Sequence, residues 1–270
     1  MAPSGGAIGV RRLPYLPAAL HTGNTMLSPL GTGISAGLGA AAALGLAAGG
    51  FAYAARWPAS RIFGDALIAP RQPGELALTF DDGPNPAWTP RLLDVLAGHG
   101  VRVTFFILGS HAQAEPALVK TIADAGHLIG NHSWDHPDLA LTAAHGVRDQ
   151  LLRTSQTLEQ IVGAPVRFFR PPFGSRRPAV LKVARELGLT SVLWNAMTSD
   201  WEEHSAEKIA ARLGQKIDRL GRRGRAGNIV LHDGSHADPA ANRGPSTLAA
   251  GMLCAQYKAT HRFVTLDAWA

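Results

Sequence analysis

Cysteine is almost absent from this sequence of 270 residues, because Cys254 is the only one. A single cysteine excludes an intramolecular disulfide and any cysteine-based metal cage. A bound metal would therefore need histidine or carboxylate ligands. Cys254 itself lies in an apolar stretch, where a cysteine typically fills the core rather than reacting.

Charge is missing from a long N-terminal stretch, because residues 13–55 contain no Asp, Glu, Lys or Arg. Residues 34–55 are almost wholly Ala, Gly and larger apolar residues, and about 20 such residues suffice to span a bilayer. We therefore predict that residues 1–70 form a leader with a transmembrane anchor or secretory signal at about 34–55. Anchor and cleaved signal both stay open, as does a translation start at Met26.

Charged residues are scarce in the chain as a whole, at 17%, and the formal net charge is +6. The basic residues are scattered except for one cluster, which consists of Arg219, Arg222, Arg223 and Arg225. Such a cluster is typical of a solvated helix end, and the alternative is attraction to anionic cell-wall polymer or lipid headgroups. We expect no nucleic-acid partner, because the interleaved aromatic and basic residues of such surfaces are absent. No protein partner is predicted either.

From residue 74 onward, short β-branched or aromatic runs alternate with longer helical patterns, which predicts repeated βα units. Seven strands are expected, at Leu76–Phe80, Val103–Leu108, His127–Asn131, Arg167–Arg170, Thr190–Asn195, Asn228–His232 and Arg262–Leu266. Six helices are expected, at Thr89 onward, Ala117–Ala125, Ala143–Val162, Ala179–Leu187, Ser205–Leu220 and Ser246–Ala259. This interleaving predicts one α/β domain over residues 71–270, a parallel barrel smaller than the usual eight-unit form.

Polar residues follow five of the predicted strands. The segments are Asp81-Asp82-Gly83-Pro84, Asn131-His132-Ser133-Trp134-Asp135-His136, Arg170-Pro171-Pro172-Phe173-Gly174, Ser199-Asp200-Trp201 and Val230-Leu231-His232-Asp233. Catalytic residues of parallel barrels gather at the carboxyl ends of the strands. We therefore predict that these segments share one rim and form one active site.

Two histidines four residues apart, His132 and His136, can present both imidazoles to one metal, on a helical turn or on a loop that bends back. A carboxylate from another strand would complete a His₂Asp site with an open position. Successive side chains alternate along a strand, so Asp81 and Asp82 are expected to point in different directions. One would bind the metal, and the other would face the water that the metal activates.

The five segments, in this order, resemble the motifs of carbohydrate esterase family 4, the polysaccharide deacetylases, over about residues 74–266. That family includes chitin, chitooligosaccharide and peptidoglycan N-deacetylases. The resemblance implies a distorted (β/α)7 TIM-like barrel and a divalent metal, usually zinc, with cobalt, manganese or nickel as alternatives. It also implies an enzyme that removes N-acetyl groups from glycans containing N-acetylglucosamine, such as peptidoglycan, chitin-like oligosaccharides or another cell-envelope polysaccharide.

The same resemblance implies a role for each motif residue. Asp81 would be the general base and His232 the general acid. The metal ligands would be Asp82, His132 and His136. A base and an acid on opposite sides of the scissile bond suit amide hydrolysis, because a poor amine leaving group must be protonated as it departs.

Further residues would support these groups. Arg170 would orient Asp81, Asp200 would pair with the side of the site formed by Arg170 and His232, and the Phe173 backbone N–H would help to hold the oxyanion. Three residues are expected to contact substrate, namely Pro172, Trp201 and Val230. The last two would line a small pocket for the acetyl methyl group, although the family more often has Leu at the Val230 position. Seven other histidines, including His236, are expected to be structural or solvent-facing.

Other functions would fit the same residues. An O-acetyl esterase of the xylan type or a deacylase of a lipid-linked aminosugar would use the same site. A catalytically inactive carbohydrate-binding module is disfavoured, because every proposed metal and proton-transfer position is filled. We expect an acetylated glycan as substrate, membrane contact through the N-terminal segment, and a catalytic domain outside the cytoplasm. Secretion or a periplasmic location would follow if the signal were cleaved.

Overall fold

The computed structural model describes residues 29–270, with side chains from residue 42 onward. The chain divides into two compact units, Met1–Ala47 and Ala48–Ala270. The segment predicted as a transmembrane anchor coincides with helix α1 (Pro29–Arg56). Among the described residues, no helix is both long and apolar enough to cross a membrane. The first part of the predicted segment and the candidate start Met26 lie outside the residues whose side chains are described.

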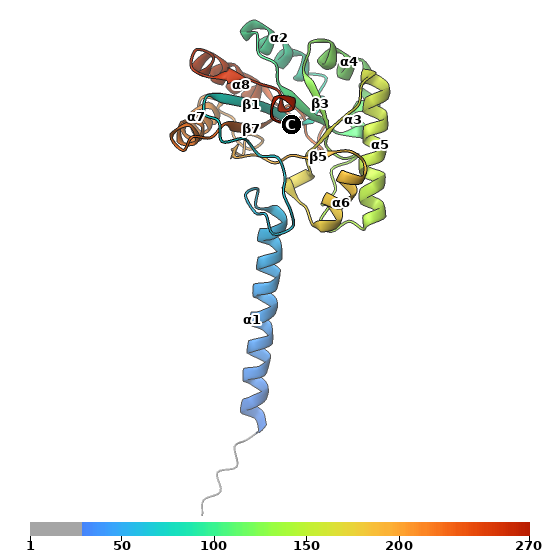
Figure 1. The fold of residues 1–270 in the computed structure, drawn as a ribbon, viewed down its shortest axis with the longest axis vertical. Coiled ribbons are helices and arrows are strands. Elements are labelled where there is room, and N and C mark those ends of the chain that lie inside the picture. The colour runs from blue at the N-terminus through green and yellow to red at the C-terminus, as the bar shows by residue number, and fades with distance from the viewer. Residues whose placement is uncertain (1–28) are drawn as a thin grey trace, which may run out of the picture. The chain divides into compact units, whose positions relative to one another are not determined.

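The second unit is built on one sheet of parallel strands, at the centre of the domain in Figure 1. Its strands are β1 (Glu75–Gly83), β2 (Thr104–Ile107), β3 (Leu128–Asn131), β4 (Phe168–Phe169), β5 (Thr190–Ser191), β6 (Ala196–Met197), β7 (Gly227–His232) and β8 (Arg262–Phe263). The order is β5-β4-β3-β2-β1-β7-β6, and β8 pairs with β1 beside this path. Every residue of β1 is buried, as expected for a central strand covered on both faces.

The two outermost strands of this order, β5 and β6, belong to one stretch of chain. Between them, the Leu193 N–H donates to the Leu67 carbonyl at 2.8 Å, and the Asn195 N–H donates to the Asn228 carbonyl at 3.2 Å. Residues 192–195 therefore link the two ends of the sheet, through bonds to the chain before β1 and to β7. The predicted distorted (β/α)7 barrel is confirmed, and its irregular seam lies at residues 190–197.

The helices lie outside the strands (Figure 1). They are α2 (Thr89–His99), α3 (Gly109–Ala114), α4 (Pro116–Asp124), α5 (Ala144–Val162), α6 (Pro178–Glu186), α7 (Ala206–Arg222) and α8 (Gly244–Tyr257). Proline stands in the first turn of α2, α4, α6 and α8, where its missing N–H costs no intrahelical bond. On α7, Ile209, Leu213 and Ile217 recur at helical spacing and are buried in the core between helix and sheet.

Two elements differ from the prediction. Helix α3 was not predicted, because its buried residues, Gly109 and Ala112, are too small to form a visible apolar stripe. The expected strand Thr190–Asn195 is shortened to β5, and a separate strand, β6, begins just after the expected range. At this break the side chain of Asn228 donates to the carbonyl oxygens of Leu193 and Ile68, both at 2.8 Å, so a side-chain amide replaces part of the strand ladder.

A buried arginine attaches the chain before β1 to the barrel. Arg176 is 1% exposed, and its guanidinium donates to the carbonyl oxygens of Ala55, Trp57 and Ser60. The distances are 3.3 Å, 3.0 Å and 2.6 Å, respectively. These bonds fix residues 55–60 against the loop that follows β4, because an unpaired buried guanidinium would be costly.

We predict that two N-terminal deletions differ in stability. A chain that begins at residue 48 keeps the carbonyl partners of Arg176 at Ala55, Trp57 and Ser60, whereas a chain that begins at residue 61 loses these three and keeps only Gly174. The shorter chain should lose about 2–5 kcal/mol of stability, measured by urea denaturation, because the buried charge loses most of its hydrogen-bond partners. Arg176→Met should destabilise the longer chain but partly restore the shorter one. Equal stability of the two deletions would contradict this account.

Candidate active site

Polar residues at four strand ends meet at one rim of the barrel. Asp81 lies opposite His232 in the pairing of β1 with β7. Asn131 pairs across to β4, so the next residue of each chain segment, His132 and Arg170, also lies at this rim. The carboxyl ends of the strands therefore bring the motifs together, as parallel barrels do.

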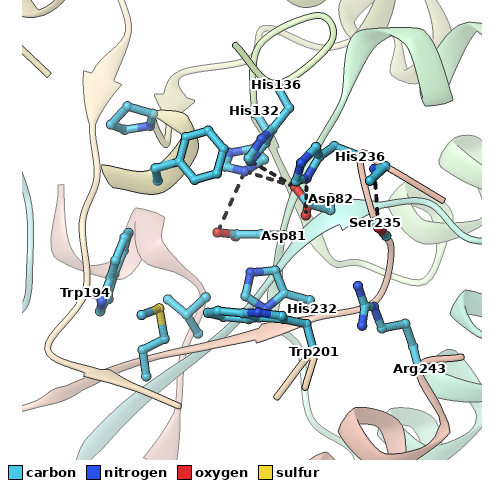
Figure 2. Close-up of a pocket in the computed structure, with 15 residues that line it drawn as sticks. Asp81, Asp82, His132, His136, Trp194, Trp201, His232, Ser235, His236 and Arg243 are labelled. Atoms are coloured by element: carbon cyan, nitrogen blue, oxygen red, sulfur yellow. Dashed lines mark hydrogen bonds and ion pairs between the residues drawn. The ribbon is translucent and has the colours of Figure 1, made fainter. Parts of the chain in front are cut away.

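A cavity of about 480 Å³ opens at this rim, and its side chains are drawn in Figure 2. Eight of the predicted site residues line it, namely Asp81, Asp82, His132, His136, Phe173, Trp201, Val230 and His232. Three other predicted residues are buried but are not part of its lining, namely Arg170, Pro172 and Asp200. Seven residues that were not predicted also line it, namely Pro171, Trp194, Met197, Ser235, His236, Ala237 and Arg243.

Asp81 and Asp82 both point into the cavity, contrary to the alternation expected along a strand (Figure 2). The pairing of β1 with β2 shifts register between Asp81 and Gly83, and Asp82 has a φ of 68°. This left-handed backbone turns Asp82 toward the face that Asp81 occupies. Asp81 Oδ2 and Asp82 Oδ1 consequently lie 4.0 Å and 3.3 Å from Nε2 of the same histidine, His132.

Asp82, His132 and His136 have the spacing of a metal site. Among the described residues they offer three ligand atoms within 4.8 Å of one another. Asp82 Oδ1 lies 3.3 Å from Nε2 of each histidine, and this buried oxygen has no hydrogen-bond partner in the described part of the chain. Ligand atoms about 2.0–2.1 Å from a tetrahedral zinc ion lie about 3.3–3.4 Å apart. The three side chains therefore fit a divalent metal.

The protonation of these groups also suits a metal. His132 Nδ1–H donates to the Arg170 carbonyl at 2.8 Å, which leaves the lone pair on Nε2. Burial and the neighbouring His132 lower the pKa of His136 to about 3, so its ring stays neutral. Burial alone would raise the pKa of Asp82, but its interactions with His132 and His236 hold that pKa well below the usual range. An ionised carboxylate beside imidazole lone pairs is a donor set that divalent metals bind.

The loop that carries the two histidines is bent rather than helical. Ser133 and His136 have φ values of 70° and 65°. Asn131 anchors this loop, because its Oδ1 accepts from the Ser133 N–H and its Nδ2 donates to the Leu151 carbonyl of α5, both at 2.8 Å. Asn131 was not assigned a role from sequence. Its only signal was a polar residue placed at the end of a strand.

Arg170 crosses the barrel interior and holds Asp81. Its Nη1 donates to Asp81 Oδ1 and Thr79 Oγ1, each at 2.7 Å, and its Nη2 donates to Asn228 Oδ1 at 3.2 Å. Arg170 is 0% exposed, so water does not screen these bonds. Oδ1 of Asp81 is therefore occupied by its hydrogen bond to Arg170. Oδ2 lies 4.0 Å from Nε2 of His132, one of the three candidate metal ligands.

His232 is held by the carboxylate of Asp200. Its Nδ1 lies 2.9 Å from Asp200 Oδ1, and its backbone N–H donates to Asp200 Oδ2 at 2.8 Å. Burial would lower the pKa of His232, but the charge and hydrogen bond of Asp200 raise it to about 9. The imidazole is therefore protonated at neutral pH. Asp200 also accepts from Ser246 Oγ at 2.7 Å, whereas Arg170 bonds elsewhere.

Aromatic side chains form much of the cavity wall. Trp201 meets the His232 ring edge-on, with centroids 5.0 Å apart and an angle of 82°. Phe173 has a φ of 57° and lies in a short 3₁₀ turn, η1 (Pro172–Gly174). Val230 also lines the cavity. Pro172 was expected to contact the substrate, but Pro171 lines the cavity instead.

His236 is a site residue that the sequence did not reveal. Its ring stacks on His136 with centroids 4.0 Å and planes 12° apart, and its Nδ1 lies 3.5 Å from Asp82 Oδ2. The same loop brings Ser235 and Arg243 to the cavity (Figure 2). The loop directly follows the strand that ends at His232, and this position alone suggested that it could reach the site. The path of the loop could not be derived from sequence.

A barrel whose rim joins a His₂Asp cluster, a second carboxylate held by an arginine, and a cationic histidine has the site of a hydrolase that can hold a metal. Known proteins agree. The polysaccharide deacetylase family matches residues 69–192. A peptidoglycan-N-acetylglucosamine deacetylase of Bacillus cereus is 37% identical over 203 residues, which cover 74% of this chain and 70% of the relative.

Two further relatives agree with this match. A chitooligosaccharide deacetylase of Sinorhizobium fredii is 37% identical over 167 residues, which cover 61% of this chain and 74% of the relative. A crystal structure of a peptidoglycan N-acetylglucosamine deacetylase, bound to a naphthyl N-hydroxybenzamide, superposes with a TM-score of 0.67. It is 35% identical, and the match covers 75% of this chain and 91% of that one. The chain belongs to the polysaccharide deacetylase family, the two relatives named above are deacetylases, and the resemblance drawn from sequence is confirmed.

We predict that His132→Ala and His136→Ala each abolish metal retention, because one remaining histidine and a carboxylate cannot replace three ligands. Affinity should fall by more than the ~10–100-fold that follows loss of a group that merely orients a ligand. Elemental analysis and chelator competition measure this. The control is His145→Ala, which changes an exposed histidine on α5. Full metal occupancy in both site variants would exclude the ligand assignment.

Proposed function

We propose that the chain removes N-acetyl groups from N-acetylglucosamine-containing glycans of the cell envelope, with its catalytic domain outside the cytoplasm. The observation that carries this proposal is the convergence in one cavity of the Asp82, His132 and His136 cluster with Asp81 and His232. The named activities of the relatives support the choice of an acetamido group as the target. Acetate release compared across peptidoglycan, chitooligosaccharides, acetylxylan and lipid-linked aminosugars tests it.

A divalent metal, for which we propose zinc, would be held by Asp82, His132 and His136. When bound, it would supply Lewis-acid chemistry, polarising the amide carbonyl and acidifying water. The chain itself keeps the donor atoms of this site fixed. His132 is oriented by the Arg170 carbonyl, and His136 is covered by the stacked ring of His236.

Asp81 acts as the general base in this proposal. Arg170 occupies its Oδ1 through a 2.7 Å hydrogen bond, and Oδ2 faces the cavity close to His132. A carboxylate held in this way can take a proton from the attacking water at Oδ2. The bond to Arg170 also prevents Asp81 from rotating away from the substrate.

His232 acts as the general acid. Because Asp200 raises its pKa to about 9, the ring carries a proton at neutral pH. With Nδ1 engaged by Asp200, the ring would deliver the proton from Nε2 to the departing amine. The backbone N–H of Phe173 would assist at the developing oxyanion.

The acetyl methyl group would fit among apolar side chains of the cavity wall. Trp201 and Val230 line this part of the cavity together with Met197. Val230 is buried, so its contribution is to close the bottom of the pocket rather than its mouth. Pro171, rather than the Pro172 expected from sequence, would contact the sugar.

We predict that Asp81→Asn and His232→Ala behave differently on an activated acetyl ester. Asp81→Asn should retain metal and lose about 10²–10⁴-fold in kcat, because the amide cannot accept a proton. His232→Ala should show a smaller defect on the activated ester than on the amide, because a good leaving group needs little protonation. Steady-state kinetics on both substrates measure this. Equal rescue of the two variants would rule out these roles.

We also predict a change in the alkaline limb of the pH profile. His232 must be protonated to act, so activity should fall as pH rises through its raised pKa, which is about 9. Asp200→Asn removes the charge that raises this pKa, so the limb should move to lower pH by about 1–3 units. The conservative change Asp218→Asn, at a carboxylate bonded to Tyr257, should leave the limb in place. An unshifted limb in Asp200→Asn would contradict the role of His232.

A further inference from the structure

A second cavity, of about 750 Å³, adjoins the catalytic one. Phe173, Trp194 and Met197 line both cavities, so the second begins where the first ends. Its remaining wall comes from residues 56–59, from Ile68 and Asn195, and from the C-terminal half of α7 with the loop that follows it. A substrate longer than one sugar could therefore extend from the catalytic cavity into this groove.

The groove is strongly cationic. Its charged lining residues are all basic, namely Arg56, Lys216, Arg219, Arg223 and Arg225. Arg56 pairs with Asp138. The other four are exposed, and none forms an ion pair with a described acidic residue.

A favourable helix dipole explains only part of this cluster. Arg219 and Arg222 stand in the last turn of α7, where cations are stabilised. Lys216, Arg219 and Arg223, however, follow one another at helical spacing and line the groove, whereas Arg222 does not. The arrangement of the charges thus follows the groove and not merely the helix end.

Aromatic surface accompanies these charges. Trp57 is 57% exposed and Phe173 is 52% exposed, and both line the groove. Their apolar faces can cover sugar rings, while guanidinium groups pair with carboxylates through two parallel hydrogen bonds. A neutral polymer of N-acetylglucosamine would leave the four free cations without counter-charges.

We propose that this groove is a second binding site, which takes carboxylate groups on the sugars that flank the N-acetylglucosamine residue being deacetylated. The inference rests on the proposed deacetylase function and narrows its substrate to an acidic glycan strand. The walls shared with the catalytic cavity favour a glycan over an anionic lipid headgroup, since a headgroup would have no need to reach that cavity. Arg219 and Arg223 are the central cations of the site.

The test compares two substrates of matched length, a carboxylate-bearing peptidoglycan fragment and a neutral chitooligosaccharide. In the double variant Arg219→Gln/Arg223→Gln, the ratio of kcat/KM for the acidic over the neutral substrate should fall about 3–10-fold. The parent's KM for the acidic substrate should rise with ionic strength, and this dependence should weaken in the variant. Arg222→Gln, from the same helix turn but outside the groove, is the matched control.

An unchanged ratio in an enzyme that deacetylates both substrates would overturn the inference and leave the proposed function intact. The double variant could instead lose binding to phosphatidylglycerol vesicles while its kcat/KM ratio stays unchanged. That result would assign the cations to a lipid surface and would also overturn the inference. If the parent released acetate from neither substrate, the proposed function and the inference would fail together. The melting temperature of each variant should match that of the parent, because the substituted side chains are exposed.

Discussion

The guanidinium group of Arg170 is fully buried inside the barrel, and the geometry of the site depends on the hydrogen bonds that compensate its charge. Removing such a charge from water costs several kcal/mol unless hydrogen bonds compensate. Its compensation comes from Thr79, Asp81 and Asn228, which belong to two neighbouring strands. The backbone carbonyl of the same residue orients His132. The positions of the proposed base and of one proposed ligand are therefore coupled through a single residue, whose side chain holds one and whose backbone carbonyl orients the other.

The cavity also separates two buried histidines into different protonation states. His136 has a pKa near 3, because burial and a neighbouring imidazole disfavour its charge, whereas Asp200 raises the pKa of His232 to about 9. When the surroundings shift the pKa values of two titratable groups apart, the two groups can take different chemical roles at one pH. A neutral ring can bind a cation, and a protonated ring can donate to a leaving group. The same side-chain type is thus suited to two different tasks within one cavity.

Sequence was sufficient to locate the rim, because the motifs follow predicted strands and parallel strands end at one edge. Local backbone conformation was not accessible in this way. The orientation of Asp82 depends on a positive φ and a register shift, which alternation along a strand does not foresee. His236 reaches the site through the path of a long loop, and α3 packs through residues too small to form a periodic signal. Errors therefore concentrate where tertiary contacts override local pattern.

Four residues at or beside the cavity hold a left-handed backbone without being glycine, namely Asp82, Ser133, His136 and Phe173. Each such conformation costs about 1–3 kcal/mol, which the rest of the fold must compensate. Glycine at these positions would relieve that strain, but at three of them it would delete a side chain that lines the cavity. Selection for heat resistance alone would therefore favour changes that dismantle this rim. The requirement for a functional side chain and the preference of the backbone for glycine conflict most directly at Asp82 and His136. The turns at these residues bring Asp82 Oδ1 and His136 Nε2 to within 3.3 Å of each other.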